Sequence, residues 1–365
     1  MRCLLFVLLF AATSLGFSAE PAARPPVVVT ANTILDDLVR QLGGDQVSTR
    51  CLIQPGADPH SFEPRPSDVK HLVAADLLVV NGLDLEPAIL KLAANCGFRG
   101  TTVVASAGIT PRSGACEHAD HAPLGTPCSN SACAHHDHEA EAKVHKTDQS
   151  NPSDQSDLHA PRSSLPSTCA TSAQSKIGNP KSKIASATPQ SADPHAWQDP
   201  RNVALYVANI RDALTLANPA AASEYQARAT AYLAELSELD HWAREQIATI
   251  PATRRKLVTS HDSLGYFAAA YDLEPVPVSG LSTAAEANAR DVAAIIDLIR
   301  HEQVPAVFFE VTSNPKLVRQ IGADAGVRLA EPLFTDSLGA PGSDTATYLT
   351  AMRSNVSRIV AALSP

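Results

Sequence analysis

The chain has 365 residues, of which 44% are apolar, and a formal net charge of −9 at pH 7. This length is too great for one modest hydrophobic core and indicates two domains. The negative charge, without clusters of Lys and Arg, argues against nucleic acid as a partner, because phosphate binding depends on such clusters.

Residues 1–19 have the pattern of a secretory signal peptide. Met1 and Arg2 precede an apolar stretch from Cys3 to Ala12, and small residues follow up to Ala19. The stretch is too short to be a permanent membrane anchor. We therefore expect an exported protein, and no lipid anchor, since no cysteine lies at the cleavage region. Six cysteines remain after export and could form disulfides whose pairing the spacing does not determine.

Residues 27–217 are predicted to form an N-terminal lobe in which strands and helices alternate. The expected strands are 27–32, 46–53, 76–82 and 101–108, and the expected helices between them are 33–42, 67–75 and 86–95. This order is typical of a parallel α/β sheet.

An insertion at about 113–191 interrupts this pattern. It is rich in Ser, Pro, Thr, Asp and Lys and poor in large apolar residues, so we expect it to lack a packed core. It nevertheless holds seven of the thirteen histidines: His118, His121, His135, His136, His138, His145 and His159. Tracts of His and acidic residues are typical of weak metal binding, although a solvated linker remains an alternative.

A long helix is expected at the junction with the second half. Asp199-Pro200 predicts one helix start and Asn218-Pro219 the next. The second helix, within a connecting segment at 218–249, would be about 45 Å long and could brace two lobes. Residues 250–365 repeat the α/β pattern, with strands at 255–261, 274–280, 306–312 and 327–336 and helices at 265–271, 290–302, 315–325 and 345–363.

Four polar residues, His60, His195, His261 and Asp336, each stand at or after such a strand-like run. Ligands of open α/β sheets bind beyond the carboxyl ends of the strands. Three imidazoles and one carboxylate form a complete tetrahedral set for a divalent cation. Taken singly, each residue could instead form a turn or cap a helix. Glu310 is a reserve ligand, or it orients a ligand imidazole.

The local motifs PGADPHSFEP (55–64), DPHAWQDP (193–200), TSHDSLGYFAAAYDL (259–273), FFEVTSNPK (308–316) and FTDSLG (334–339) carry a family resemblance. Together they resemble the metal-specific solute-binding proteins of ABC transporters, solute-binding family 9. The resemblance implies two α/β lobes joined by a long rigid helix, with a metal site in the cleft between them. It implies His60, His195, His261 and Asp336 as ligands, and a periplasmic receptor, expected to be a monomer, that delivers its ion to a membrane permease and its ATPase. One departure is Glu286-Ala287-Asn288, where the family often has Glu-Pro-Ser.

The third ligand position favours zinc. Manganese receptors of this family usually have Glu where this chain has His261, and nitrogen ligands suit zinc, whereas oxygen ligands suit manganese. Manganese and iron(II) remain alternatives. Two alternative functions of a different class are an exported zinc hydrolase and a metal-buffering protein. A hydrolase needs an open coordination position, and no HExxH or GxSxG motif is present, so we expect no enzyme.

Overall fold

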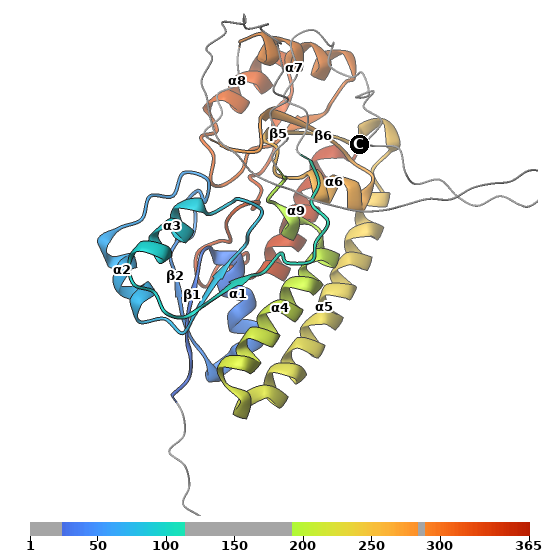
Figure 1. The fold of residues 1–365 in the computed structure, drawn as a ribbon. Coiled ribbons are helices and arrows are strands. Elements are labelled where there is room, and N and C mark those ends of the chain that lie inside the picture. The colour runs from blue at the N-terminus through green and yellow to red at the C-terminus, as the bar shows by residue number, and fades with distance from the viewer. Residues whose placement is uncertain (1–23, 114–191, 284–288) are drawn as a thin grey trace, which may run out of the picture. The chain divides into compact units, whose positions relative to one another are not determined.

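A computed structural model describes residues 24–113, 192–283 and 289–365 of the chain (Figure 1). The predicted signal peptide, the seven histidines of the insertion and Glu286-Ala287-Asn288 lie outside these described residues.

The first half forms a parallel four-stranded sheet with the order β2-β1-β3-β4. Its elements, in chain order, are β1 (Val27–Thr30), α1 (Thr33–Gly43), η1 (Gly44–Gln46), β2 (Ser48–Cys51), α2 (Pro66–Val73), β3 (Leu77–Val80), α3 (Pro87–Asn95) and β4 (Thr101–Val104). The inner strand β3 reads Leu-Leu-Val-Val and all four residues are buried, as expected for a parallel strand covered on both faces. The Asn32 side chain accepts from the Leu35 amide and begins α1 directly after β1.

Two long helices connect the halves. They are α4 (Pro200–Ala217) and α5 (Ala222–Ala248), with the short turns η2 (Ala196–Gln198) and η3 (Pro219–Ala221) before each, and they lie side by side (Figure 1). The 27 residues of α5 span about 40 Å. One stripe of α5 is buried at a spacing of three and four residues, and the helix packs against α1, α4 and α9. These contacts explain how α5 is held in place although its overall amphipathicity is low.

The second half forms another parallel sheet, with the order β6-β5-β7-β8. Its elements, after the turn η4 (Ala252–Arg254), are β5 (Lys256–His261), α6 (Gly265–Tyr271), β6 (Glu274–Ser279), α7 (Ala289–His301), β7 (Ala306–Val307), α8 (Lys316–Ala325), β8 (Arg328–Leu329) and α9 (Tyr348–Leu363). Alternate residues of this sheet enter different cores. Leu257 and Phe308 join the core that includes the first sheet, whereas Val258 and Val307 pack with residues of α7 and α8.

The predicted fold class, two parallel sheets flanked by helices with a long joining helix, is confirmed. Two predicted strands were much too long, however. Residues 306–312 and 327–336 contribute two-residue strands and then one isolated bridge between Glu310 and Leu333. Pro332 has no N–H for a continuous ladder, and pairing is limited to Leu333, whose N–H donates to the Phe309 carbonyl at 2.8 Å, before the chain reaches Asp336. The last helix likewise begins at Tyr348 rather than Thr345, because the Thr347 side chain caps it.

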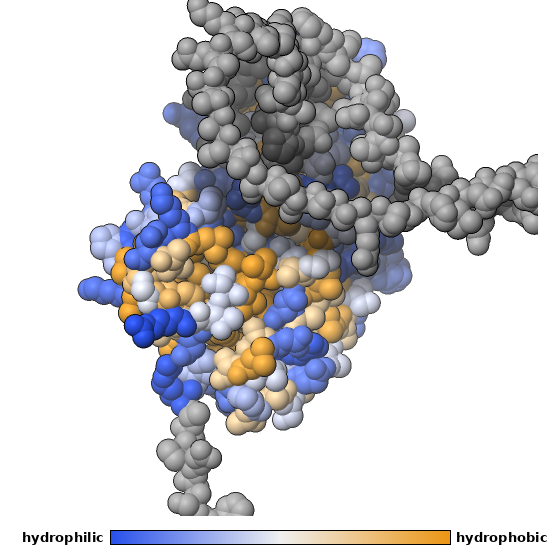
Figure 2. All heavy atoms as spheres, viewed as in Figure 1, coloured by the Kyte–Doolittle hydropathy of each residue, from blue (hydrophilic) through white to orange (hydrophobic). Residues whose placement is uncertain are grey.

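Some large apolar side chains remain exposed, among them Val73 on α2, Leu90 on α3 and Leu205 on α4. Figure 2 shows apolar residues gathered over this part of the molecule. Single exposed apolar residues are normal on protein surfaces, and these assign no site by themselves. Within the described ranges, Cys51 and Cys96 are free thiols, and no helix is long and apolar enough to cross a membrane.

Candidate metal centre

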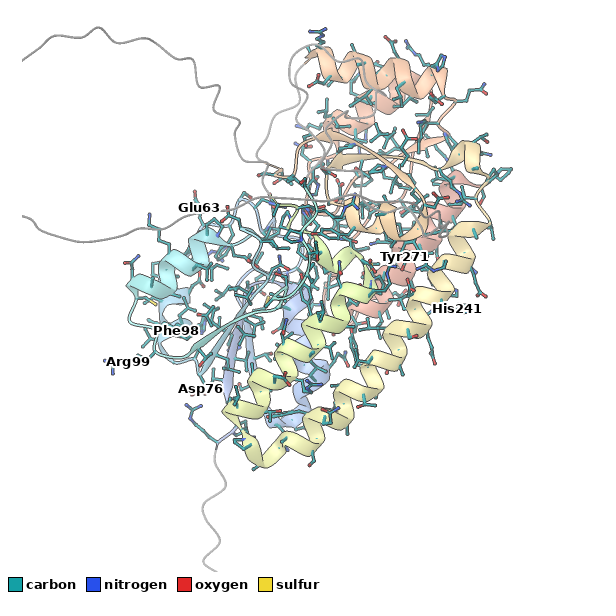
Figure 3. All side chains as sticks on the ribbon, turned by 45° about the vertical axis from the view of Figure 1, so that its right-hand side comes forward. Glu63, Asp76, Phe98, Arg99, His241 and Tyr271 are labelled. Carbon is teal, nitrogen blue, oxygen red and sulfur yellow. The ribbon has the colours of Figure 1, made fainter. Side chains whose placement is uncertain are left out.

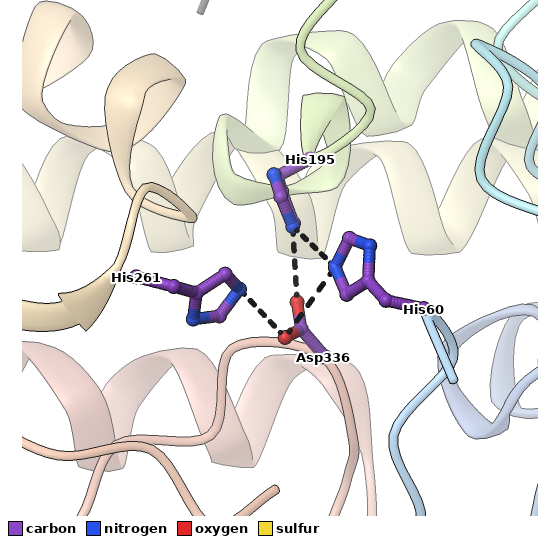
Figure 4. A group of neighbouring side chains, drawn as sticks. All are labelled: His60, His195, His261 and Asp336. Atoms are coloured by element: carbon purple, nitrogen blue, oxygen red, sulfur yellow. Dashed lines mark hydrogen bonds and ion pairs between the residues drawn. The ribbon is translucent and has the colours of Figure 1, made fainter. Parts of the chain in front are cut away.

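The structure brings His60, His195, His261 and Asp336 together into one group, which we call the His3Asp cluster (Figure 4). Each residue offers one donor atom, and these atoms all lie within 4.8 Å of one another. The His60 side chain is 7% exposed, and the other three are 0 to 1% exposed. Among the residues that the structure describes, no second group of three or more His, Cys, Asp or Glu side chains could hold an ion.

The four residues come from four different segments. His60 lies in the loop after β2, and His195 lies directly before η2. His261 is the last residue of β5, and Asp336 lies in the loop between β8 and α9. The prediction that Asp336 ends a strand was wrong, because β8 stops at Leu329. Long-range folding therefore assembles the cluster, with His261 alone carried by a strand.

The shorter donor distances are close to those around a small tetrahedral cation. With metal–ligand distances near 2.05 Å, the donors of a tetrahedral zinc site lie about 3.3 Å apart. His60 Nε2 is 3.1 Å from His195 Nε2, His195 Nε2 is 3.4 Å from Asp336 Oδ1, and His261 Nε2 is 3.0 Å from Asp336 Oδ2. The short contacts to Asp336 use two different oxygens, His60 Nε2 is 4.0 Å from Asp336 Oδ2, and the four donor atoms lie within 4.8 Å of one another. The donors must therefore contract to close around one ion. The spacing suits one ion with four protein ligands.

Several donor atoms of the cluster have no hydrogen-bond partner. Both carboxylate oxygens of Asp336 and both ring nitrogens of His261 are buried and make no hydrogen bond of good geometry, although His261 Nε2 lies at ion-pair distance, 3.0 Å, from Asp336 Oδ2. Buried polar atoms of this kind are costly unless they find a partner. A cation in the cluster would give a partner to the Asp336 carboxylate and to one nitrogen of His261 together.

The charges in the cluster are unevenly distributed. Burial lowers the pKa of His60 to about 4, so this imidazole is neutral at pH 7. Burial also disfavours a charged His261, but the carboxylates of Asp336 and Glu310 outweigh it and hold the pKa of His261 well above its ordinary value. Burial would raise the pKa of Asp336, yet the three imidazoles, His261 first, hold it below the ordinary range. The metal-free cluster therefore retains a proton on His261 beside an ionised Asp336.

Two further carboxylates face the outer nitrogens of two imidazoles. Asp193 Oδ1 is 2.8 Å from His195 Nδ1 and also accepts the His195 backbone N–H at 2.9 Å. Glu310 Oε1 lies 3.4 Å from His261 Nδ1 and is fully buried. A carboxylate at Nδ1 directs Nε2 and its lone pair towards the metal position. The geometry thus favours the orienting alternative for Glu310 over the reserve-ligand alternative.

Asp193 was not among the predicted site residues. A signal was available, since Asp-Pro-His occurs twice, at 58–60 and 193–195. In both copies the Asp side chain accepts the backbone N–H of the His at 2.9 Å, which makes the same tight turn. The repeated tripeptide is therefore a device for presenting a histidine.

The segment after His195 is bonded to the segment before Asp336. Trp197 Nε1 and Gln198 Nε2 both donate to the Thr335 carbonyl at 2.7 Å. The Trp197 ring also lies edge-on to the His195 ring, with centroids 5.4 Å apart. These contacts link the segments that carry two candidate ligands, one from each half of the chain.

Other helical histidines lie apart from the cluster. The side chains of His241 and His301 are 77% and 87% exposed, and Figure 3 shows His241 pointing outward from α5. His71 on α2 is partly buried. None of them belongs to the His3Asp cluster.

Comparisons with known proteins agree with this fold and site. The family described as "Zinc-uptake complex component A periplasmic" matches residues 28–362. The "Manganese-binding lipoprotein MntA" of Halalkalibacterium halodurans is 29% identical over 92% of this chain and 88% of its own length. The "Iron-binding protein YfeA" of Yersinia pestis is 28% identical over 91% of this chain and 84% of its own length.

Among solved structures, the "periplasmic zinc binding protein TroA from Treponema pallidum" matches with a TM-score of 0.69 and 26% identity. The match covers 93% of this chain and 99% of that one. The names of the relatives span manganese, iron and zinc, so likeness alone does not single out a metal. The comparisons support neither the hydrolase nor the buffering alternative, and the prediction that the chain is not an enzyme is confirmed. The chain belongs to the periplasmic zinc-uptake component A family of metal-binding substrate-binding proteins of ABC transporters.

Proposed function

We propose that this protein captures zinc outside the cytoplasm and delivers it to an ABC permease, with His60, His195, His261 and Asp336 as its four ligands. The observation that carries the proposal is the buried His3Asp cluster, which offers three nitrogens and one carboxylate within 4.8 Å. Zinc is a borderline-soft ion with no geometric preference of its own, and it accepts these four ligands in a closed tetrahedron.

The donor chemistry favours zinc over manganese and iron(II). Manganese prefers oxygen donors and a higher coordination number. The two additional carboxylates near the cluster, Asp193 and Glu310, face outer ring nitrogens rather than the centre of the cluster. A manganese receptor that uses this same His3Asp cluster is the alternative that competition must test, since one relative is named for that metal.

Capture exchanges the water shell of the ion for four protein donors. His60 is neutral at pH 7 and can bind directly, whereas His261 must lose its proton first, because a protonated imidazole has no lone pair. The two orienting carboxylates and Asp336 together offset the charge of a divalent ion. Release at the permease would then require the ligand segments to separate.

The arrangement along the chain supports a receptor of two lobes, residues 27–217 and 250–365, joined at 218–249. The packing of α5 against α1, α4 and α9 favours small relative motion of the lobes. We infer a monomer that is exported by its predicted leader to the periplasm. Several relatives are named lipoproteins, so whether this chain is also anchored is a separate question, which mass spectrometry of the mature N-terminus would answer.

The seven histidines between residues 113 and 191 would collect zinc weakly and pass it to the cluster. The described ends of this insertion support such transfer, since Ser113 pairs with Ala192, three residues before His195. The two ends of the insertion therefore meet close to a candidate ligand.

Zinc calorimetry on the mature protein tests the proposal. Because Ser113 and Ala192 pair antiparallel, an Asn-Gly turn can replace residues 114–191 with little disturbance of their pairing. The shortened protein should retain one tight zinc site. Excess manganese should not displace zinc from this site, and His261→Ala should weaken zinc binding sharply. The absence of a tight site, or indifference to His261→Ala, would refute the ligand assignment. Loss of weak sites alone would support the collecting role of the insertion.

A further inference from the structure

Asn81, a fully buried residue directly after β3, holds the turn that presents His195. Its side-chain Nδ2 donates to the carbonyl of Pro194 at 2.9 Å, across 113 positions of sequence, and to the carbonyl of Gly82 at 2.9 Å. Pro194 stands between the orienting Asp193 and the candidate ligand His195. One amide group therefore reaches the centre of the second Asp-Pro-His motif.

The orientation of this amide is determined by its other contacts. Tyr206 on α4 donates its hydroxyl to Asn81 Oδ1. A flipped amide would place Oδ1 against the carbonyls of Gly82 and Pro194, which cannot donate. The backbone is held as well, since Ser106 donates both its hydroxyl, at 2.6 Å, and its N–H, at 3.1 Å, to the Asn81 carbonyl. All hydrogen-bonding groups of Asn81 are thus engaged.

The turn that follows Asn81 is strained. Gly82, Leu83 and Asp84 have φ values of +87°, +52° and +65°, a left-handed run that Leu and Asp adopt at a cost. The buried carboxylate of Glu86 accepts the N–H of Asn81 at 2.9 Å and that of Gly82 at 3.3 Å. These contacts hold the strained turn, and with it Asn81, in place.

We propose that Asn81 is a positioning residue for zinc binding, acting through His195 by fixing the Pro194 carbonyl. This inference rests on the proposed function. Within the described part of the chain, Asn81 makes no hydrogen bond to His60, His261 or Asp336, so its effect should pass through one ligand of the four. Asn81 lies directly after a strand of the first sheet and contacts the Asp-Pro-His motif at the Pro194 carbonyl. Asp193, inside the motif, contacts the His195 imidazole.

The test is zinc affinity in Asn81→Asp, which replaces the amide donor by a carboxylate facing two carbonyls. Competition with a chromogenic zinc chelator, on the full mature chain, should show affinity about 10- to 100-fold weaker, as for other outer partners of metal ligands. The matched control is Asn209→Asp. Asn209 donates its amide to two carbonyls in the same way, those of Ala105 and Ala107, without a contact to the His195 segment. It should change affinity less than twofold.

Double-mutant cycles separate positioning from general destabilisation. The loss caused by Asn81→Asp should nearly vanish in a His195→Ala background and persist fully in a His60→Ala background. Equal losses in all backgrounds, or no loss in the wild-type background, would overturn the inference. If Asn81→Asp does not fold, Asn81→Ser, which is too short to reach Pro194, carries the same cycle. A wild-type protein without a tight site would instead refute the proposed function.

Discussion

Glu86 should make the stability of the metal-free protein depend on pH in a defined window. Its carboxyl group is buried at the start of α3, and burial raises its pKa from the ordinary 4.5 to about 7, although the N–H groups of Asn81 and Gly82 stabilise the carboxylate. The folded protein therefore binds a proton between pH 4.5 and 7 that the unfolded chain has already lost.

The sign and size follow from proton linkage. Because the folded pKa lies above the unfolded one, the stabilisation is complete below pH 4.5 and is lost as the pH rises through 7. A difference of about 2.5 in pKa, at 1.36 kcal/mol for each unit, corresponds to about 3 kcal/mol of unfolding free energy. Glu86→Gln removes the titration and retains one acceptor for the Asn81 N–H.

Urea unfolding of the zinc-free protein from pH 4 to pH 8 measures this effect. The unfolding free energy of the wild type minus that of Glu86→Gln should fall by about 3 kcal/mol across the window. The subtraction cancels the contribution of the histidines, which both proteins share. Glu63→Gln removes an exposed glutamate, which Figure 3 shows at the surface, and controls for loss of a negative charge. If the unfolding free energies of the wild type and Glu86→Gln changed in parallel with pH, the reasoning would be refuted.

Three further predictions concern the His3Asp cluster. Zinc binding at pH 7 should release close to one proton, because His261 must deprotonate, and calorimetry in buffers of different ionisation enthalpy should show no such release in His261→Ala. Asp193→Asn should weaken zinc binding about 10-fold by removing the charged acceptor at His195 Nδ1, and unchanged affinity in a chelator competition would contradict that role. Zinc should change the fluorescence emission of Trp197, which lies against His195. The change in emission should survive Trp242→Phe and disappear in Trp197→Phe, and the opposite result would refute the assignment.

Local patterns in the sequence determined much of this protein. Alternating apolar runs and capping pairs such as Asp199-Pro200 predicted both sheets and the long helices, because these signals depend on neighbours in the chain. The motifs around His60, His195, His261 and Asp336 predicted residues that the structure brings together. Short strands were predicted poorly, since β7 and β8 are limited by Pro332 and by their partners in the sheet.

Tertiary structure alone decided how the four candidate ligands are held. Asn81 lies 113 positions from Pro194, and Trp197 lies 138 positions from Thr335, so no local pattern relates these residues. The proton on His261 likewise depends on Asp336 and Glu310, which reach it only in the folded chain. Hydrogen bonds and electrostatic interactions act through space, whereas periodicity and motifs act along the sequence. The sequence therefore predicted the candidate donors, and folding determined their separation, orientation and charge.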